Sequence, residues 1–449
     1  GPAYKFALLA QITDSDWESV GFGDGFDVIP DSKDSRFGFS TSQGGELARY
    51  DRLTGILHNI QPVHPNGTKL RFNWDAGMNV DQIDRSIFYL GSQFVHKTSD
   101  FGKSWEIISP DLTTNDSRKQ KQNESGGLTI DDSSAENHTT ITVIETSWRE
   151  NNLIWVGTDD GNIQLTTNGG KTWNEVGHKI KGVPENSWIT QIKHSKHKDG
   201  EAFVVIDDHR RDNWIPYIYR TQNYGKTWQR LVDEEDVWGF ALSFVQDPIE
   251  PNLMFVGTEF GLYYTLDGGE NWIQWKKDLP TVAVKDMLIH PREYDLVLGT
   301  FGRSIWILDD IRPLRELASD VSILDKQLHL FDIPKTYLGV LGFPSLHRGA
   351  DDDFSGQNRQ YGALLSYYSK NASAKNEVMV NIYDADEQLI REIKTTAKPG
   401  VNRLVWNLRE KGSDLPGHRD LRTQFLMDGA NVFYGEYTVE IVVGDKRIS

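Results

Sequence analysis

The sequence predicts an all-β protein in which a β-propeller of about six blades precedes a small β-sandwich. Three observations carry this prediction. An eight-residue phrase occurs four times, an apolar strand recurs every 42 to 66 residues, and a new series of short alternating strands begins near residue 361. Self-similarity at a period of roughly 40–50 residues is typical of propeller blades.

The repeated phrase has the pattern Thr-x-Asp/Asn-x-Gly-x-(Ser/Thr/Asn)-Trp and spans 98–105, 166–173, 221–228 and 265–272. Asp or Asn bonds its own backbone two residues on in a turn, Gly tolerates a left-handed backbone, and Trp buries a large apolar body. We therefore expect four structural hairpin turns with Trp anchors. Their residues are Asp100, Asn168, Asn223 and Asp267, with Trp105, Trp173, Trp228 and Trp272.

An apolar strand that ends in a small or polar residue recurs six times. The aligned small residues fall at 41, 91, 157, 206, 257 and 299, and the polar stretch 109–138 explains the longest interval as an inserted loop. Pro- and Asp-containing turns precede the strands, so each unit has the strand order of an antiparallel meander. We count six units between about residues 15 and 312, within a propeller domain expected at 1–318.

The number of blades in the full ring is open. Six units could close a ring alone. The first unit lacks a good copy of the phrase, and the chain begins abruptly with Gly1-Pro2. We therefore also consider a larger ring, in which N-terminal blades of the same protein would be partners of the blades present.

The strand pattern changes after the sixth unit. Residues 319–360 mix short apolar pieces with a polar loop and are interpreted as a connector. From 361 to 449, strands such as Ala363–Tyr368 and Glu377–Tyr383 alternate with Gly, Pro and Asp turns. Short strands at this spacing predict a small β-sandwich.

Composition excludes several functional classes. The chain has 449 residues, a net charge of −17 and no cysteine. A basic nucleic-acid-binding face is therefore not expected, nor are disulfides, cysteine-based zinc sites or a thiol nucleophile. No apolar run reaches the roughly 18 residues of a membrane span. Phosphate-loop, nucleotide-binding and metalloprotease motifs are absent, so no cofactor is expected, and His209 alone does not predict a metal site.

Most candidate site residues follow the second strand of a unit, because propeller ligands usually lie on the loops of one face near the central channel. Asp24 and Asp27 come instead from the start of the first unit. Weak catalytic candidates are Asp160, Asp208 and Glu259, and binding candidates are Asp24, Asp27, His209, Arg210 and Arg303. The most charged short segment is 207–213, Asp-Asp-His-Arg-Arg-Asp-Asn. The alternative reading is that these residues form turns and inter-blade salt bridges.

The four phrases resemble the Asp-box, or BNR repeat, of sialidase-like and Vps10/sortilin-like propellers. Together with phrases such as 155–161, 256–262 and 299–310, they resemble the C-terminal half of large secreted bacterial proteins of the Vps10/sortilin-like "glycosyl hydrolase" type. Residues 398–406 and 435–439 resemble the FlgD-type immunoglobulin-like domain. The resemblance implies a bacterial protein that is secreted, periplasmic or at the cell surface, with the Asp-boxes at the periphery, away from the binding face.

Three functions remain open from the sequence. The first is a binding module for an extracellular protein, peptide or glycan. The second is a glycoside hydrolase, sialidase-like and acting on a polysaccharide, with carboxylate catalysis in the central channel. The third is a structural part of a surface assembly. The early Phe-Arg-Ile-Pro phrase typical of sialidases is absent, so the binding module is the leading hypothesis.

Overall fold

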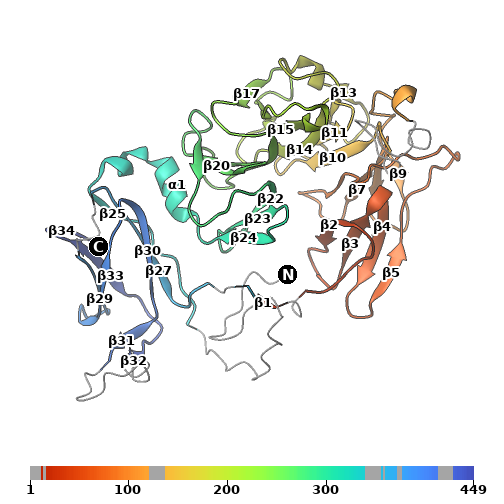
Figure 1. Ribbon diagram of the computed structural model, residues 1–449. Coiled ribbons are helices and arrows are strands. Elements are labelled where there is room, and N and C mark those ends of the chain that lie inside the picture. The colour runs from red at the N-terminus through yellow and green to blue at the C-terminus, as the bar shows by residue number, and fades with distance from the viewer. Residues whose placement is uncertain are drawn as a thin grey trace. The chain divides into compact units, whose positions relative to one another are not determined.

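The structure is a computed structural model of the chain, shown in Figure 1. It describes residues 12–13, 17–120, 137–338, 355–356, 359–371, 377–412 and 428–449. The chain divides into two compact units, one of residues 19–308 and one of residues 309–449 with 1–18.

Residues 19–308 form six antiparallel sheets in chain order, and each sheet is a meander. The first blade contains β2 (Gly25–Pro30), β3 (Phe37–Ser42), β4 (Glu46–Asp51) and β5 (Ile56–Asn59), and the second β6 (Met78–Val80), β7 (Phe88–Gly91), β8 (Val95–Thr98) and β9 (Glu106–Ile107). The third contains β10 (Ile141–Thr146), β11 (Ile154–Thr158), β12 (Ile163–Thr166) and β13 (Asn174–Glu175), and the fourth β14 (Trp188–His194), β15 (Ala202–Asp207), β16 (Tyr217–Thr221) and β17 (Gln229–Val232). The fifth contains β18 (Ala241–Gln246), β19 (Met254–Thr258), β20 (Gly261–Thr265) and β21 (Ile273–Trp275), and the sixth only β22 (Val284–Ile289), β23 (Leu296–Thr300) and β24 (Ile305–Leu308).

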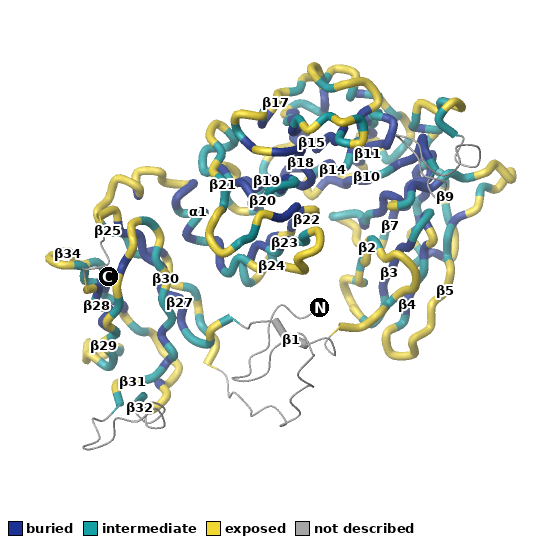
Figure 2. The backbone as a smooth tube through the Cα atoms, viewed as in Figure 1, coloured by how far each residue is buried: buried dark blue, intermediate teal, exposed yellow. Residues whose placement is uncertain are grey.

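These six sheets confirm the predicted β-propeller. The six apolar strands recognised in the sequence are the second strands β3, β7, β11, β15, β19 and β23. Strands β11, β15 and β19 are buried along their whole length, whereas outer turns such as 52–55, between β4 and β5, are exposed (Figure 2). Their near-continuous apolar sequences follow from this burial on both faces.

Each Asp-box closes a turn by a repeated set of hydrogen bonds. Thr98 Oγ1 accepts the Gly102 N–H at 3.0 Å, and the equivalent bond recurs in the other three boxes at 2.9–3.1 Å. Asp100 Oδ1 accepts the N–H groups of Lys103 and Ser104, three and four residues on, at 2.9 Å each. The sequence predicts that the Asp100 side chain accepts the N–H of Gly102, two residues on, but this N–H donates to Thr98. The Thr98 hydroxyl also accepts the Asp100 N–H at 3.4 Å.

The meander gives the propeller two chemically different faces. Turns between the first and second strands and between the third and fourth strands lie at one end of each sheet, and they include the four Asp-boxes. Bonds such as Gly169 N–H to the Asn152 carbonyl at 2.9 Å join these two turns within a blade. We name this end the Asp-box face. The loops between second and third strands, and between blades, lie at the opposite end, which we name the loop face.

The innermost strands carry bulges near their loop-face ends. The pairing register shifts at Thr142 in β10, Thr190 in β14, Leu242 in β18 and Lys285 in β22, and around Asp27 in β2. A bulge leaves a residue unpaired and bends the strand, which changes the direction of its side chain. The bulge therefore places the region of Asp27 out of regular register.

The sixth blade has an apolar face that is open to solvent. Leu288, Val297 and Ile307 are directly paired across β22, β23 and β24 and form one row on that face. Leu288 is 62 % exposed and Ile307 is 36 % exposed, and the neighbouring Ile305 is 49 % exposed. Aliphatic residues at alternate positions are the pattern of a buried sheet face, so this face has the composition of a blade interface.

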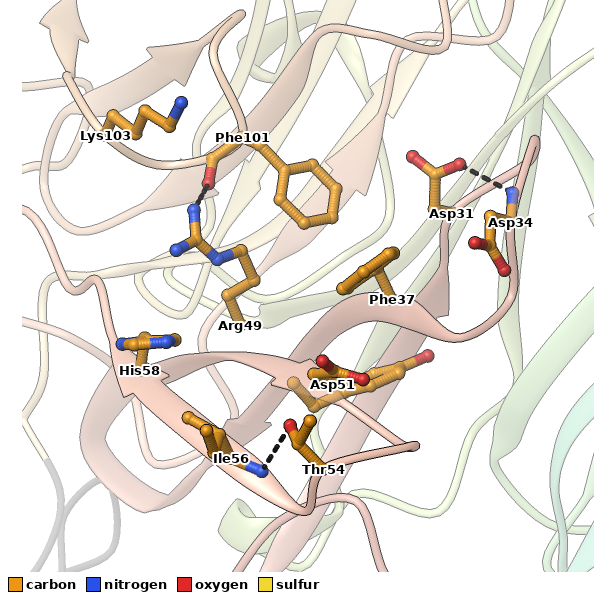
Figure 3. Close-up of a pocket in the computed structure, with 11 residues that line it drawn as sticks. Asp31, Asp34, Phe37, Arg49, Asp51, Thr54, Ile56, His58, Phe101 and Lys103 are labelled. Atoms are coloured by element: carbon orange, nitrogen blue, oxygen red, sulfur yellow. Dashed lines mark hydrogen bonds between the residues drawn. The ribbon is translucent and has the colours of Figure 1, made fainter.

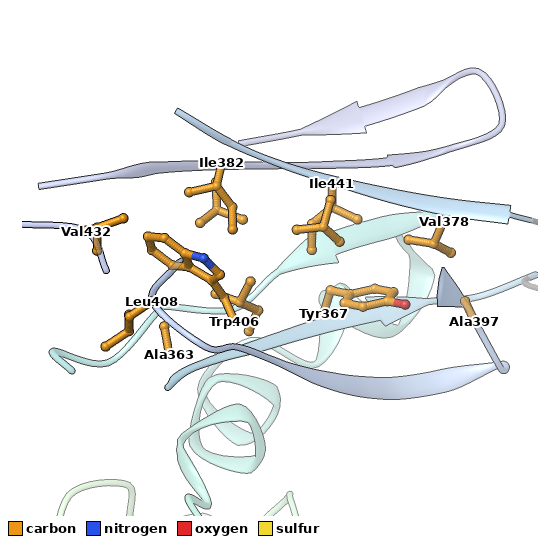
Figure 4. Close-up of a cluster of buried hydrophobic side chains, with 12 residues drawn as sticks. Ala363, Tyr367, Val378, Ile382, Ala397, Trp406, Leu408, Val432 and Ile441 are labelled. Carbon is orange, nitrogen blue, oxygen red and sulfur yellow. The ribbon is translucent and has the colours of Figure 1, made fainter. Parts of the chain in front are cut away.

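The second unit is built of two sheets that pack face to face. One sheet has the order β25 (Leu328–Leu330), β27 (Ala363–Ser369), β30 (Gly400–Trp406), and the other β29 (Leu389–Thr396), β28 (Glu377–Tyr383), β33 (Thr438–Val443), β34 (Lys446–Ile448). Figure 4 shows Tyr367 and Trp406 of the first sheet against Ile382 and Ile441 of the second. The predicted β-sandwich is present, and its immunoglobulin-like type stays a prediction.

Smaller elements complete the two units. They are α1 (Arg312–Ser319), η2 (Gln43–Gly45), η3 (Ser117–Lys119), η4 (Gly177–Lys179), η5 (His209–Arg211), η6 (Val321–Asp325), and the short pairs β1 (Ile12–Thr13) with β26 (Ser355–Gly356) and β31 (Arg409–Lys411) with β32 (Asp428–Asn431). Strand β25 pairs with β27, so part of the segment interpreted as a connector belongs to the sandwich. Its three-residue length explains why the sequence did not reveal it. None of the described helices has the length and hydropathy of a membrane-spanning segment.

Candidate functional site

An aromatic pocket lies on the loop face where the fourth and fifth blades meet. It has a volume of about 380 Å³ and is lined by Trp214, Pro216, Glu234, Val237, Trp238, Gly239 and Phe260. These residues come from three connections at the same end of the sheets, which are the β15–β16 loop, the β17–β18 loop and the β19–β20 turn. Trp214 is 50 % exposed and Trp238 is 62 % exposed. We call this site the aromatic pocket.

Local backbone bonds hold the two tryptophans in place. Trp238 stacks on Phe260 with ring centroids 4.0 Å apart, and its backbone N–H donates to the Tyr263 hydroxyl at 3.1 Å. The next residue, Gly239, has a φ of 82°, and a Cβ there would come within 2.7 Å of the Phe260 ring. Glycine is therefore required beside the stack. The Trp214 indole donates to Asp212 Oδ1 at 3.1 Å.

Two of the predicted binding residues stand beside the aromatic pocket. The His209 ring stacks on Phe240 at 4.5 Å, and Trp214 contacts the same Phe240 edge-on at 5.3 Å. His209 Nδ1 is 2.6 Å from Asp207 Oδ2, which fixes the orientation of the ring. The exposed Arg210 guanidinium lies 3.6 Å from the centroid of the Trp188 ring.

Two of the predicted catalytic carboxylates are occupied by internal bonds. Asp208 is buried, and its oxygens accept hydrogen bonds from Arg211 Nε at 2.6 Å and Asn213 Nδ2 at 3.0 Å. Asp160 is also buried and accepts from the backbone and hydroxyl of Thr114 and from the Thr158 hydroxyl. A carboxylate held in this way orders its loop, and it presents no oxygen to a substrate.

The remaining predicted residues are dispersed. Glu259 is half-buried in the β19–β20 turn, next to Phe260 of the aromatic pocket, and its backbone N–H donates to the Phe240 carbonyl at 3.2 Å. Arg303 is exposed in the β23–β24 turn of the sixth blade, and Asp24 is exposed before β2. None of the predicted residues lines the aromatic pocket itself. Asp208, His209 and Arg210 lie in the β15–β16 loop and Glu259 lies in the β19–β20 turn, two of the connections that form the pocket, whereas Arg303 and Asp24 belong to other blades.

Carboxylates from three blades interact near the axis of the propeller. The side chains of Asp75, Asp27 and Asp286 stay accessible to solvent, but the surrounding blades remove part of the water around Asp75. This partial desolvation, together with the nearby negative charges of Asp27 and Asp286, raises the pKa of Asp75 to about 7. The pKa of Asp27 is also raised, by the same loss of solvent and by Asp286, and Lys193 opposes this effect. No sequence motif marks Asp75 or Asp286. They are neighbours only because each lies on the innermost side of its blade.

A larger hollow of about 500 Å³ lies on the outer strands of the first blade (Figure 3). Most of its charged groups, such as Asp51 and Arg49, are engaged with a neighbouring side chain or with the backbone. Arg36 Nε donates to Asp51 at 2.6 Å, and Arg49 donates to the Phe101 carbonyl at 3.1 Å. The hollow lacks the exposed aromatic surface of the aromatic pocket. Among the described residues, no group of three or more histidine or acidic side chains is arranged to hold a metal ion.

Comparisons with known proteins find likeness in structure only. No protein-family model and no curated protein matches the sequence. A GH74 enzyme from Niastella koreensis is similar over 64 % of this chain and 45 % of its own, with 16 % identity and a TM-score of 0.44. A GH74 xyloglucanase from Xanthomonas campestris is similar over 62 % of this chain and 43 % of its own, with 15 % identity and a TM-score of 0.44.

YCF48 from Cyanidioschyzon merolae is similar over 54 % of this chain and 70 % of its own, with 14 % identity and a TM-score of 0.36. The chain thus spans less than half the length of the two GH74 enzymes. The sheets described above are what identify the chain as a β-propeller followed by a β-sandwich.

Proposed function

We propose that the propeller is a binding module that holds a glycan at the aromatic pocket. The observation that carries the proposal is the pair Trp214 and Trp238, which are half or more exposed on either side of an apolar hollow. Exposed aromatic clusters rimmed by polar groups mark interaction sites, because leaving them in water is unfavourable. Tryptophan also carries much of the binding energy at interfaces.

The chemistry of the rim favours a glycan. A sugar ring has an apolar C–H face that packs on an indole, and hydroxyl groups that donate to carboxylates. The stacked Trp238 and Phe260 supply the flat apolar surface, while Glu234 lines the hollow and Glu259 stands beside it. The volume of about 380 Å³ is at the low end for small-molecule sites, which suits one or two sugar rings of a longer chain.

A glycan array followed by calorimetry tests this proposal. We expect Trp238→Ala and Trp214→Ala each to lower the affinity for the tightest-binding glycan at least 10-fold, since hot-spot aromatics contribute about 2 kcal/mol or more to the binding free energy. Trp148→Ala is the matched control, because Trp148 is also exposed but lies in a turn of the Asp-box face. Binding of peptides but not glycans, dependent on Trp238, would assign a peptide partner instead. Absence of any ligand would reject the binding module.

Glycoside hydrolysis is a second candidate, and the axial carboxylates favour it. A carboxyl group with a pKa of about 7, Asp75, near the carboxylates Asp27 and Asp286 is a combination that suits an acid and a base or nucleophile. A panel of chromogenic glycosides and polysaccharides tests it. Turnover should fall by roughly 10³-fold in Asp75→Asn and Asp27→Asn, but not in Asp24→Asn, which changes an exposed carboxylate. Turnover that all three variants retain would exclude these residues from catalysis.

We also propose that the protein acts outside the bacterial cytoplasm and that further blades of the same protein pack on the open face of the sixth blade. The resemblance of its repeats to secreted Vps10/sortilin-like proteins supports the first point, and the solvent-exposed Ile305 and Ile307 support the second. Fractionation of cells that make the full-length protein tests the location. Recovery in the cytoplasm alone would contradict it.

A further inference from the structure

A smaller cavity, with charged and polar side chains in its walls, lies on the propeller axis toward the Asp-box face. It has a volume of about 220 Å³, and its walls come from the innermost strands of five successive blades. Asn79 of β6, Glu145 of β10, Lys193 of β14, Gln246 of β18 and Leu288 of β22 each contribute a wall. Gln246 is the last residue of its strand, and Glu145, Lys193 and Leu288 are each next to last, so the cavity lies where these strands enter their first turns. We call it the axial pocket.

The carboxylate in the axial pocket is satisfied by its own neighbours. Glu145 is buried, and Oε1 accepts the His194 backbone N–H at 3.1 Å. Its Oε2 accepts Asn79 Nδ2, also at 3.1 Å. These bonds fix Glu145 against the wall, and Lys193 and Lys196 act on it only as nearby positive charges.

Two lysines of the axial pocket have no such partner. Among the described residues, the ammonium groups of Lys193 and Lys196 form no hydrogen bond and no ion pair within 4.0 Å, although both interact electrostatically with Glu145. Lys196 Nζ lies 3.7 Å from the centroid of the Trp148 ring, which holds it at the rim. Two cations against one carboxylate give this small cavity a net positive charge in a chain of net charge −17, which is a local attraction for an anion.

The rest of the lining is apolar. Phe203, Met287 and Leu288 face the cavity, and Trp148 at the rim is 40 % exposed. Small-molecule sites combine such walls with a few polar groups that orient the ligand. A phosphate dianion fits less well, because the pocket offers no arginine fork and because the Glu145 carboxylate would repel a double charge.

We propose that the axial pocket binds a small aliphatic carboxylate, with its charged head between Lys193 and Lys196 and its aliphatic part against Leu288 and Trp148. The carboxylate belongs either to a free acid or to the C-terminal end of a peptide, since both present the same group at this size. The site is independent of the aromatic pocket, which opens on the opposite face of the propeller.

The affinity for 4-methylpentanoate, measured by NMR or calorimetry at constant ionic strength, tests the proposal. The neutral isostere 4-methylpentanamide should bind at least 10-fold more weakly. Lys193→Met and Lys196→Met keep the aliphatic stem and remove the charge. Each should lower the affinity for 4-methylpentanoate at least 10-fold. Lys276→Met, at an exposed position on the fifth blade, should leave the affinity unchanged. Circular dichroism confirms that each variant is folded, and either lysine variant alone suffices for the comparison.

Several outcomes would overturn the proposal. They are equal binding of the acid and the amide, equal loss in Lys276→Met, no saturable binding by the unmodified protein, and binding of inorganic phosphate as tight as that of the acid. A further pair of probes identifies the source of the carboxylate. If Ala-Ala-Ala-Leu binds more tightly than 4-methylpentanoate and its C-terminal amide does not bind, the ligand is a peptide end. If the peptide binds more weakly than the acid, the ligand is a free acid.

Discussion

The Trp173 indole donates its Nε1–H to the carbonyl oxygen of Ile108, in the preceding blade, at 3.0 Å. The same bond recurs from Trp105 to Ile60, Trp228 to Val176 and Trp272 to Leu231, at 2.8–3.3 Å. Each Asp-box tryptophan thus joins its blade to the one before it. The repeated phrase therefore encodes both a turn within a blade and a contact between blades.

Loss of one of these bonds should destabilise the propeller measurably. Trp173→Phe keeps a large aromatic ring and removes the donor, so the Ile108 carbonyl loses its partner. We expect the free energy of unfolding to fall by about 1 kcal/mol, the typical contribution of a hydrogen bond. Denaturant unfolding measures this, with Trp238→Phe as the control because Trp238 is 62 % exposed. Equal stability of the two variants would contradict the structural role of the bond.

The box glycine is constrained by the same contact. Gly170 has a φ of 93°, and a Cβ there would lie 2.3 Å from the Ile108 carbonyl oxygen. Gly55 has a φ of 69° but no heavy atom within 4 Å of its Cβ position. Gly55→Ala should cost about 1 kcal/mol for the left-handed backbone alone, and Gly170→Ala at least about 2 kcal/mol more from the added overlap. Thermal unfolding compares them, and similar losses would show that the overlap is relieved at no cost.

Stability should depend on pH through Asp75. Its folded pKa of about 7 lies above the ordinary value of 3.8, so the folded state binds more protons than the unfolded state between about pH 4 and 7. Stability therefore falls as pH rises through this range. Asp75→Asn should flatten the dependence and stabilise the protein at pH 8 by about 1 kcal/mol, a value reduced for solvent screening. An unchanged pH profile would contradict the raised pKa.

The open face of the sixth blade should behave as exposed apolar surface. Ile305→Thr with Ile307→Thr should lower binding of a hydrophobic dye and change the free energy of unfolding by less than about 0.5 kcal/mol, as is usual for surface positions. Leu296 and Leu298 are buried in the same blade, so Leu298→Thr should instead destabilise it. A loss of 2 kcal/mol or more in the double variant would show that this face is already covered.

Much of the fold was predictable because its signals are local. The Thr, Gly and Trp of each Asp-box lie within eight residues, and the apolar second strands are buried on both faces, so both leave a pattern in the sequence. Asp208 and Asp160 were predicted as catalytic candidates from their position after a strand. The alternative, that such residues form turns and salt bridges, describes Asp208, whose carboxylate accepts Arg211 Nε three residues on. Thr114 lies 46 residues from Asp160, so no local pattern predicts their hydrogen bonds.

The sequence by itself determined the repeat, the order of the strands within a blade and the turns that separate them, since these depend on residues close in the chain. Only the tertiary structure decided which side chains meet. Trp214 and Phe260 reach one pocket from different blades, and Lys193 and Leu288 reach another because every innermost strand faces the same axis. The closing of successive blades around that axis is a long-range property, and no local pattern of residues specifies it.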